Sequence, residues 1–87
     1  MKFELSQNYP NPLTPSTIIK YSVPKGQLGT LKVYNMLGQE VATLVNNQQN
    51  AGNYEVTFNA DRLASGIYFY TLNAGSFVST KKMILLK

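Results

Sequence analysis

Apolar and polar residues alternate with a period of two along most of the chain, as in strands that bury one face. The alternation is clearest where Tyr54, Val56 and Phe58 are separated by polar residues. Turn-forming residues interrupt the pattern roughly every 8–12 positions. The pattern predicts strands at residues 3–7, 16–23, 30–36, 40–45, 53–58 and 67–72, and from residue 77 onward. Seven short strands without a long helix are typical of an all-β sandwich or barrel.

Two segments between these runs break the alternation. Residues 8–15 hold three prolines, which cannot donate to a ladder, so we expect an extended crossover there. In residues 40–45, Val41, Leu44 and Val45 do not share a face, which predicts a bulge or an edge strand. The polar residues 46–50 that follow predict a loop.

The last predicted strand ends in four consecutive apolar residues, Met83, Ile84, Leu85 and Leu86, where alternation fails. Such a run fits a strand buried on both faces or a frayed end of the chain. It also fits a strand displayed to another protein, which would bind it by strand addition or through its side chains. The pattern leaves these readings open, and it makes weak dimerisation through this strand a further expectation.

A glycine turn at Gly66 leads directly into an aromatic run. Immunoglobulin-like sandwiches place a tyrosine at this point, and its hydroxyl bonds to nearby backbone. Tyr68 fits that corner role, and Tyr70 takes the next inward position. Phe69 falls on the opposite face, exposed or beneath a loop, where a carbohydrate-binding platform is the alternative interpretation.

The composition argues against an enzyme. The 87 residues, predicted to be one domain over residues 1–87, include 44% hydrophobic and 14% charged residues, as in a globular fold. Histidine and cysteine are absent, which removes the usual general base, nucleophile and soft metal ligands. No two of the acidic residues lie within five positions of each other: Glu4, Glu40, Glu55 and Asp61. We therefore expect no catalytic residue, no metal site and no cofactor.

The positive charge does not indicate a nucleic-acid partner. The net charge is +4, but the basic residues are scattered lysines with the single arginine Arg62. No run approaches the ~20 apolar residues of a membrane-spanning helix. The first five residues also lack the apolar stretch of a signal peptide.

Six segments, taken in order, resemble one family closely. They are LSQNYPNP (residues 5–12), PSTIIKYSVP (15–24), LKVYNMLGQEVATLV (31–45), AGNYEVTFNA (51–60), LASGIYFYTLNAG (63–75) and FVSTKKMILLK (77–87). The set resembles the type A C-terminal sorting domain of proteins exported by the type IX secretion system. It is also similar to the immunoglobulin-like domain of the flagellar hook-capping protein. The resemblance covers nearly the whole chain.

The resemblance implies a seven-stranded antiparallel immunoglobulin-like β-sandwich at the end of a larger cargo protein. It implies recognition by an outer-membrane translocon, cleavage by a sortase-like protease, and a secreted or cell-surface cargo. The alternative is a structural or adhesion module, hook-cap-like or carbohydrate-binding, that supports a neighbouring domain. The sorting-signal candidates implied by the family motifs and the terminal run are Pro10, Pro12, Gly66, Tyr68, Lys81, Lys82, Met83, Ile84, Leu85, Leu86 and Lys87.

Overall fold

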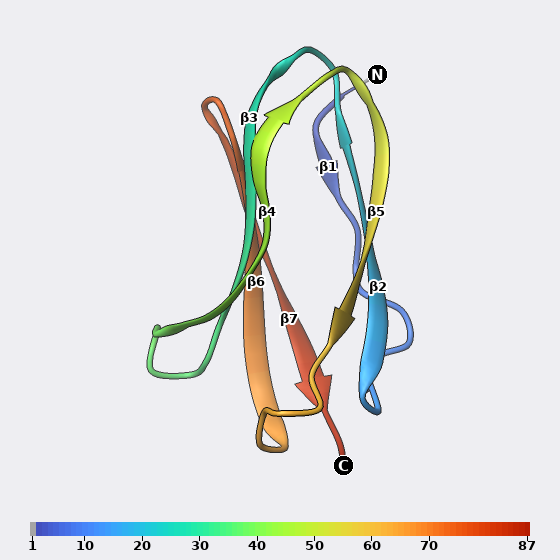
Figure 1. Ribbon diagram of the computed structural model, residues 1–87, viewed down its shortest axis with the longest axis vertical. Coiled ribbons are helices and arrows are strands. Elements are labelled where there is room, and N and C mark those ends of the chain that lie inside the picture. Colours follow the sequence, from blue (N-terminus) through green and yellow to red (C-terminus); the bar gives the residue numbers. More distant parts are fainter. Residues whose placement is uncertain (1) are drawn as a thin grey trace.

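A computed structural model describes residues 2–87, which form seven strands in two sheets (Figure 1). All of the paired strands are antiparallel. One sheet has the order β1-β2-β5 and the other the order β4-β3-β6-β7. The strands are β1 (Glu4–Leu5), β2 (Ser16–Val23), β3 (Gln27–Tyr34), β4 (Glu40–Gln49), β5 (Gly52–Asn59), β6 (Gly66–Ala74) and β7 (Phe77–Leu85).

This arrangement is the predicted seven-stranded β-sandwich of the immunoglobulin-like class. The chain crosses between the two sheets from β2 to β3, from β4 to β5 and from β5 to β6, whereas the other consecutive strands are neighbours in one sheet. Residues 2–87 contain no helix. The same residues accordingly offer no helix of the length and apolarity needed to span a membrane.

The core fills the space between the two sheets with alternate residues from each strand, as the alternation predicted. From the four-stranded sheet, Leu31, Tyr70 and Leu72 are fully buried. From the other sheet, Ile19 is fully buried and Tyr21 nearly so. Period-two patterning therefore identified the inward face of β2, β3, β5 and β6 correctly.

The predicted loop at residues 46–50 is wrong, because β4 continues to Gln49. The extension has a partner, since β3 begins at Gln27 rather than at Thr30, and Gln27 lies opposite Gln49. Gln49 is only 9% exposed, and its Oε1 accepts a hydrogen bond from the buried Tyr21 hydroxyl at 2.7 Å. A polar run thus forms a strand because β3 pairs with its backbone and the buried Tyr21 bonds to its last side chain.

The prediction of a bulge or an edge at residues 40–45 is confirmed. β4 lies at the edge of its sheet, and its pairing with β3 shifts register between Leu31 and Lys32 and again between Val33 and Tyr34. Each shift moves the following side chains to a different face, which explains why the apolar residues of β4 do not alternate.

The proline-rich segment is an extended crossover, as predicted, but it is not wholly unpaired. Tyr9 forms an isolated antiparallel bridge with Ile18, and Leu13 forms an isolated parallel bridge with Leu85. The predicted first strand is shorter than expected, because only Glu4–Leu5 pairs with β2 as β1. The three X–Pro peptide bonds of the crossover are cis.

At the end of the chain, the four consecutive apolar residues place hydrophobic side chains on both faces of β7, as the failed alternation predicted. Met83 and Leu85 are fully buried in the core, whereas Ile84 is half-buried on the outer side and Leu86, just past β7, is 50% exposed. The apolar run persists because Ile84 lies opposite Ile67 of β6, so its outer side also has an apolar neighbour. β7 is therefore a regular strand rather than a frayed end.

Candidate recognition site

The outer edge of β7 is partly covered by the crossover, through backbone bonds from Leu13. The Leu13 N–H donates to the Ile84 carbonyl at 2.9 Å, and the Leu86 N–H donates to the Leu13 carbonyl at 3.1 Å. Leu13 is fully buried, although it lies among prolines. This one residue therefore joins the crossover to the end of β7.

Two side chains extend this contact, one from the crossover and one from the residue just before it. The Ile84 N–H donates to Asn11 Oδ1 at 3.0 Å, and Gln7 Nε2 donates to the Lys82 carbonyl at 2.6 Å. The edge of β7 is therefore occupied from the Lys82 carbonyl onward.

Tyr70 anchors the first part of the crossover to the four-stranded sheet. Its buried hydroxyl donates to the Ser6 carbonyl and accepts from the Asn8 N–H, both at 2.7 Å. Burial raises the pKa of Tyr70 to about 12, although the hydrogen bond from Asn8 acts in the opposite direction. Asn8 is also buried, and its Nδ2 donates to the Pro10 carbonyl and to Thr17 Oγ1, both at 3.1 Å. The crossover is therefore held in one conformation by buried polar contacts.

The predicted tyrosine corner is confirmed at Tyr68. Its hydroxyl donates to the Ala64 carbonyl at 2.7 Å, and the ring is 8% exposed. Gly66, between them, has a φ of +152°, a conformation that favours glycine. The Gly66–Tyr68 motif therefore fixes the path of the chain into β6.

We expect Tyr68→Phe to lower the free energy of unfolding by about 1 kcal/mol, because it removes one partly buried hydrogen bond. Ala64 is exposed, so water can satisfy its freed carbonyl. Chemical denaturation of both proteins measures the difference. A loss below about 0.3 kcal/mol, the scale of neutral surface changes, would show that the corner bond contributes nothing to stability.

The chain end at Lys87 folds back onto the same corner. The Lys87 N–H donates to Ser65 Oγ at 3.0 Å, and its Nζ donates to the Asp61 carbonyl. Lys82 is exposed on the outer side of β7, whereas Lys81 is half-buried and lies on the side of the core.

Neither of these two β7 lysines forms an ion pair within residues 2–87, where the one ion pair joins Lys32 Nζ and Glu40 Oε1 at 3.4 Å. The pKa of Glu40 is lowered, first by the hydrogen bond from the Thr43 hydroxyl and then by Lys32.

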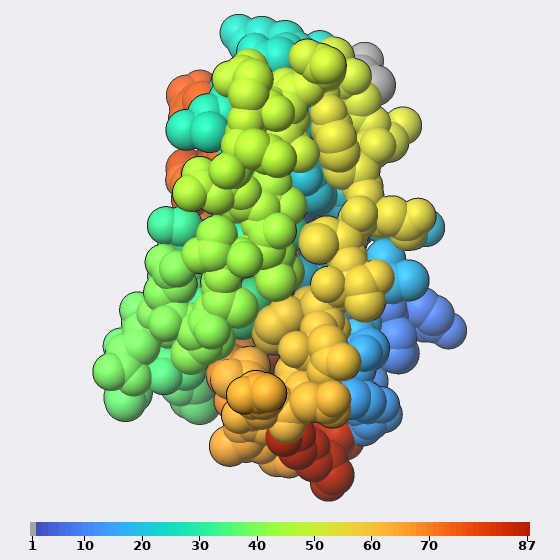
Figure 2. Space-filling view, viewed as in Figure 1, coloured from blue at the N-terminus to red at the C-terminus, as the bar shows by residue number. Residues whose placement is uncertain are grey.

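The structure brings most of the candidate residues to one end of the sandwich. Gly66 lies opposite Leu85, and Tyr68 lies opposite Met83. Asn11 and Leu13 of the crossover bond to the same stretch of β7, and the exposed Pro10 precedes Asn11 in the chain. Figure 2 shows the last residues (red) exposed at this end, against the segment near residue 60.

We call this end the sorting end, after the sorting-domain family that the sequence resembles, and define it by the crossover residues Pro10–Leu13, the corner residues Ala64–Tyr68 and the chain end Met83–Lys87. Pro12 and Lys87 are exposed there, whereas Met83 and Leu85 are buried and serve the core. Lys81 and Lys82 come before Met83 in β7 and lie outside the sorting end.

Sequence reasoning missed Leu13, Asn11 and Ser65, which connect the motifs. An apolar residue inside a proline-rich segment was the available signal for Leu13.

Phe69 lies on the outer face of the four-stranded sheet, on the opposite side from Tyr68 and Tyr70, as predicted. It is half-buried between Tyr34 of β3 and Lys82 of β7, its partners across the two neighbouring strands.

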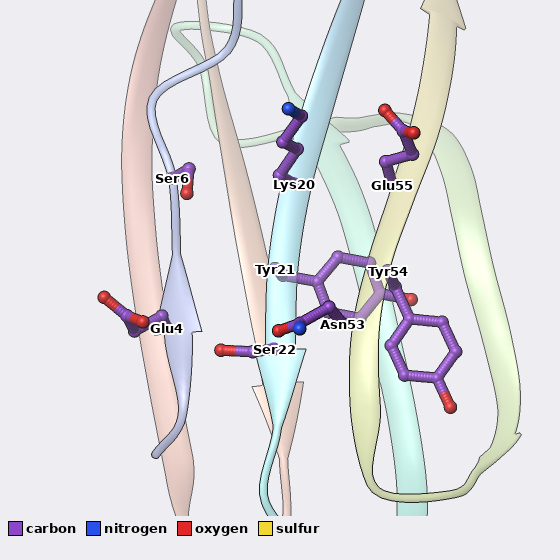
Figure 3. A pocket seen from close by; sticks show the side chains of 8 residues that line it. All are labelled: Glu4, Ser6, Lys20, Tyr21, Ser22, Asn53, Tyr54 and Glu55. Carbon is purple, nitrogen blue, oxygen red and sulfur yellow. The ribbon is translucent and has the colours of Figure 1, made fainter. Parts of the chain in front are cut away.

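A shallow groove of about 400 Å³ lies on the outer face of the three-stranded sheet (Figure 3). Polar side chains of both charges project from its strands. The rings of Tyr21 and Tyr54 stack on each other on the opposite, inward face of the sheet, with centroids 5.3 Å apart. Within residues 2–87 no three His, Cys, Asp or Glu side chains cluster in a way that could hold a metal ion. The groove is lined by Glu4, Ser6, Lys20, Tyr21, Ser22, Asn53, Tyr54 and Glu55.

Fold and site together define an immunoglobulin-like β-sandwich in which two sequence-distant motifs and the chain end converge at one end. Comparison with family models then identifies the family: the secretion system C-terminal sorting domain matches residues 7–86. The chain belongs to this family. Searches of curated proteins and of solved structures gave no significant match.

Proposed function

We propose that this domain is a type IX secretion signal that directs a cargo polypeptide, joined to its N-terminal side, across the outer membrane. The translocon recognises the sorting end. The observation that carries this proposal is the convergence of the crossover, the Gly66 corner and the exposed Leu86 and Lys87. Membership of the sorting-domain family supports it independently.

The same proposal extends to the fate of the cargo. A sortase-like protease cleaves the chain ahead of this domain, and the cargo is then released or attached at the cell surface. The folded domain suits a signal that is recognised and then discarded, because residues 5–85 form a core of their own, with Phe3 packed against it.

The test uses a reporter that carries a signal peptide, fused ahead of the domain and expressed in a cell with type IX secretion. Deleting the chain end would remove Met83 and Leu85 from the core, so lost export could reflect unfolding alone. Leu86→Ser and Lys87→Glu instead change residues outside the core, where effects on stability are typically within about 0.5 kcal/mol. We expect each to reduce export roughly tenfold, as for the loss of one recognition contact.

Matched controls lie at the opposite end of the sandwich. Leu28→Ser changes a leucine that is 56% exposed, close to the 50% of Leu86, and Lys25→Glu reverses an exposed lysine. We expect both to leave export unchanged. Full export of Leu86→Ser and of Lys87→Glu would refute recognition through the sorting end, and so would an equal loss in the controls.

A further inference from the structure

β7 carries a second feature, an open edge in its first half, that the sorting end does not use. We infer that this edge binds an extended polypeptide segment rich in carboxylates, which pairs with β7 as an additional strand. The inference rests on the proposed function for its biological setting, because the acidic segment would belong to the export machinery. Hydrogen bonding and charge along β7 support it.

The hydrogen bonds of β7 show which backbone groups face away from β6. The Lys82 carbonyl accepts from Gln7, and both backbone groups of Ile84 and the Leu86 N–H bond to the crossover. The backbone N–H and C=O groups of the even-numbered residues therefore point away from β6. By the alternation of an antiparallel ladder, Val78 and Thr80 point the same way. Five consecutive groups therefore have no partner within residues 2–87: N–H and C=O of Val78, N–H and C=O of Thr80, and N–H of Lys82.

The crossover demonstrates that this edge accepts a strand. Leu13 already pairs with β7 in parallel through two backbone hydrogen bonds of 2.9 and 3.1 Å. The open groups continue the same row, and Val78 beside them is 61% exposed. An exposed row of unpaired N–H and C=O groups is a template for strand addition, in which main-chain bonds supply the affinity.

Charge selects the partner. Lys81 and Lys82 flank the open segment on its two faces, and residues 66–85 contain no carboxylate. Neither lysine has an ion-pair partner in the part of the chain that the structure describes. β1 lies close to β7, and Phe3, just before β1, stacks on Phe77 at the start of β7 with ring centroids 4.9 Å apart. The one acid of β1, Glu4, is exposed on the other sheet. An added strand with acidic side chains would therefore meet uncompensated positive charge.

The same lysines oppose pairing between two copies of the domain. An inward-facing charge on an edge strand is a device that proteins use against edge-to-edge association. In a symmetrical pair centred on Thr80, the two Lys81 side chains become diagonal neighbours roughly 7–8 Å apart. A second copy therefore brings repulsion where an acidic strand brings attraction.

The other edges suit this role less well. β1 is only two residues long, and β4 is distorted by two register shifts. β5 is regular, but it begins at Gly52 and ends at Asn59, residue types that are poor in strands, and it carries Glu55 on its outer face. Among the edges of residues 2–87, β7 combines a regular open segment with positive charge.

The binding test uses the folded domain and two capped heptapeptides, one alternating threonine with glutamate and the other threonine with lysine. Both have the same length and strand propensity, and they differ only in charge. At low ionic strength we expect the acidic peptide to bind at least roughly tenfold more tightly, measured by NMR titration. The amide signals of Val78, Thr80 and Lys82 should shift and exchange more slowly with solvent.

Thr80→Pro tests the backbone contact. The Thr80 N–H faces outward without a partner, so proline removes it while leaving the ladder with β6 intact. We expect affinity for the acidic peptide to fall roughly tenfold.

Thr57→Pro is the matched control, because Thr57 is exposed on β5 and its N–H also faces outward. The Ala60 N–H bonds to the Pro15 carbonyl, which sets that alternation. The control should bind the acidic peptide like the parent domain.

Lys82→Glu tests the charge and does not depend on proline being tolerated. We expect this variant to prefer the basic peptide, with Lys20→Glu on β2 as a control that keeps the original preference. The inference is overturned if both peptides bind equally, or if folded Thr80→Pro binds like the parent. It is also overturned if the domain dimerises without peptide and protects the Val78 and Thr80 amides, because the occupant is then a second copy.

Export of the reporter separates this inference from the proposed function. If the parent domain exports the reporter and folded Thr80→Pro exports it equally well, the edge is not the binding site although the signal function stands. If the parent domain does not export the reporter at all, the proposed function fails, and the peptide titrations alone decide whether the edge binds acidic strands.

Discussion

Leu85→Ala is expected to lower the free energy of unfolding by about 3 kcal/mol. The side chain is fully buried opposite Gly66, which has no side chain to move into the space that alanine leaves. Leucine-to-alanine changes in cores typically cost about 2–5 kcal/mol, because transfer and cavity terms add. A domain of this size has roughly 5–15 kcal/mol in total, so the change removes a large share.

Ile84→Ala is the matched control, because Ile84 is the adjacent residue but lies half-buried on the outer side. We expect it to cost about 1 kcal/mol. Urea denaturation of both variants measures the contrast. Equal losses at the two positions would contradict the inward placement of Leu85 and with it the regular alternation of β7.

Tyr70→Phe is expected to cost about 2–3 kcal/mol, although it removes a single oxygen. The change leaves the Asn8 N–H without its partner, and Asn8 is only 2% exposed. The Ser6 carbonyl also loses its bond, but Ser6 is exposed and water can replace the donor. An unsatisfied buried group costs about 1–3 kcal/mol, so most of the loss comes from Asn8. Tyr9→Phe, at a side chain 80% exposed, should change stability by less than about 0.5 kcal/mol.

Alkaline pH supplies a second readout for the same variant. The pKa of Tyr70 is raised to about 12 by burial, above the roughly 10 of a tyrosine in an unfolded chain. The folded state thus holds this proton more tightly, and the resulting stability is present below pH ~10 and lost between pH ~10 and ~12. The difference in stability between the parent and Tyr70→Phe should therefore shrink over that range. A difference that stays constant would contradict a buried, hydrogen-bonded Tyr70.

The parts of the fold that the sequence predicts are those in which local pattern and burial agree. In β5, Tyr54, Val56 and Phe58 alternate with polar residues, and these three side chains do turn inward. Tyr68 was also predictable, because a glycine turn before an aromatic strand has one common structural use.

The predictions that fail concern residues whose structural partners are distant in sequence. The sequence around Gln49 predicts a loop. In the fold, Tyr21 donates a hydrogen bond to Gln49 and Gln27 pairs with it, and both lie more than twenty positions away in sequence. Ile84 does interrupt the alternation, but the reason for an apolar residue there is seen only once its neighbour Ile67 on β6 lies opposite it. In the candidate site, the motifs are local in sequence and could be predicted. Leu13, which joins them, could not, because its role depends on β7 lying next to it.

The parallel bridge between Leu13 and β7 also has a mechanical consequence. In Figure 1, β1 lies in the upper half of the sandwich and the end of β7 at the opposite end of the long axis, which measures 37 Å. Tension between the two ends pulls the crossover and β7 in opposite directions along their shared axis. The two Leu13 bonds are then loaded together, in shear, and must break together before the strands separate. The domain is thus built to resist being drawn out by its ends, whereas a force applied across β7 would open the same bonds one at a time.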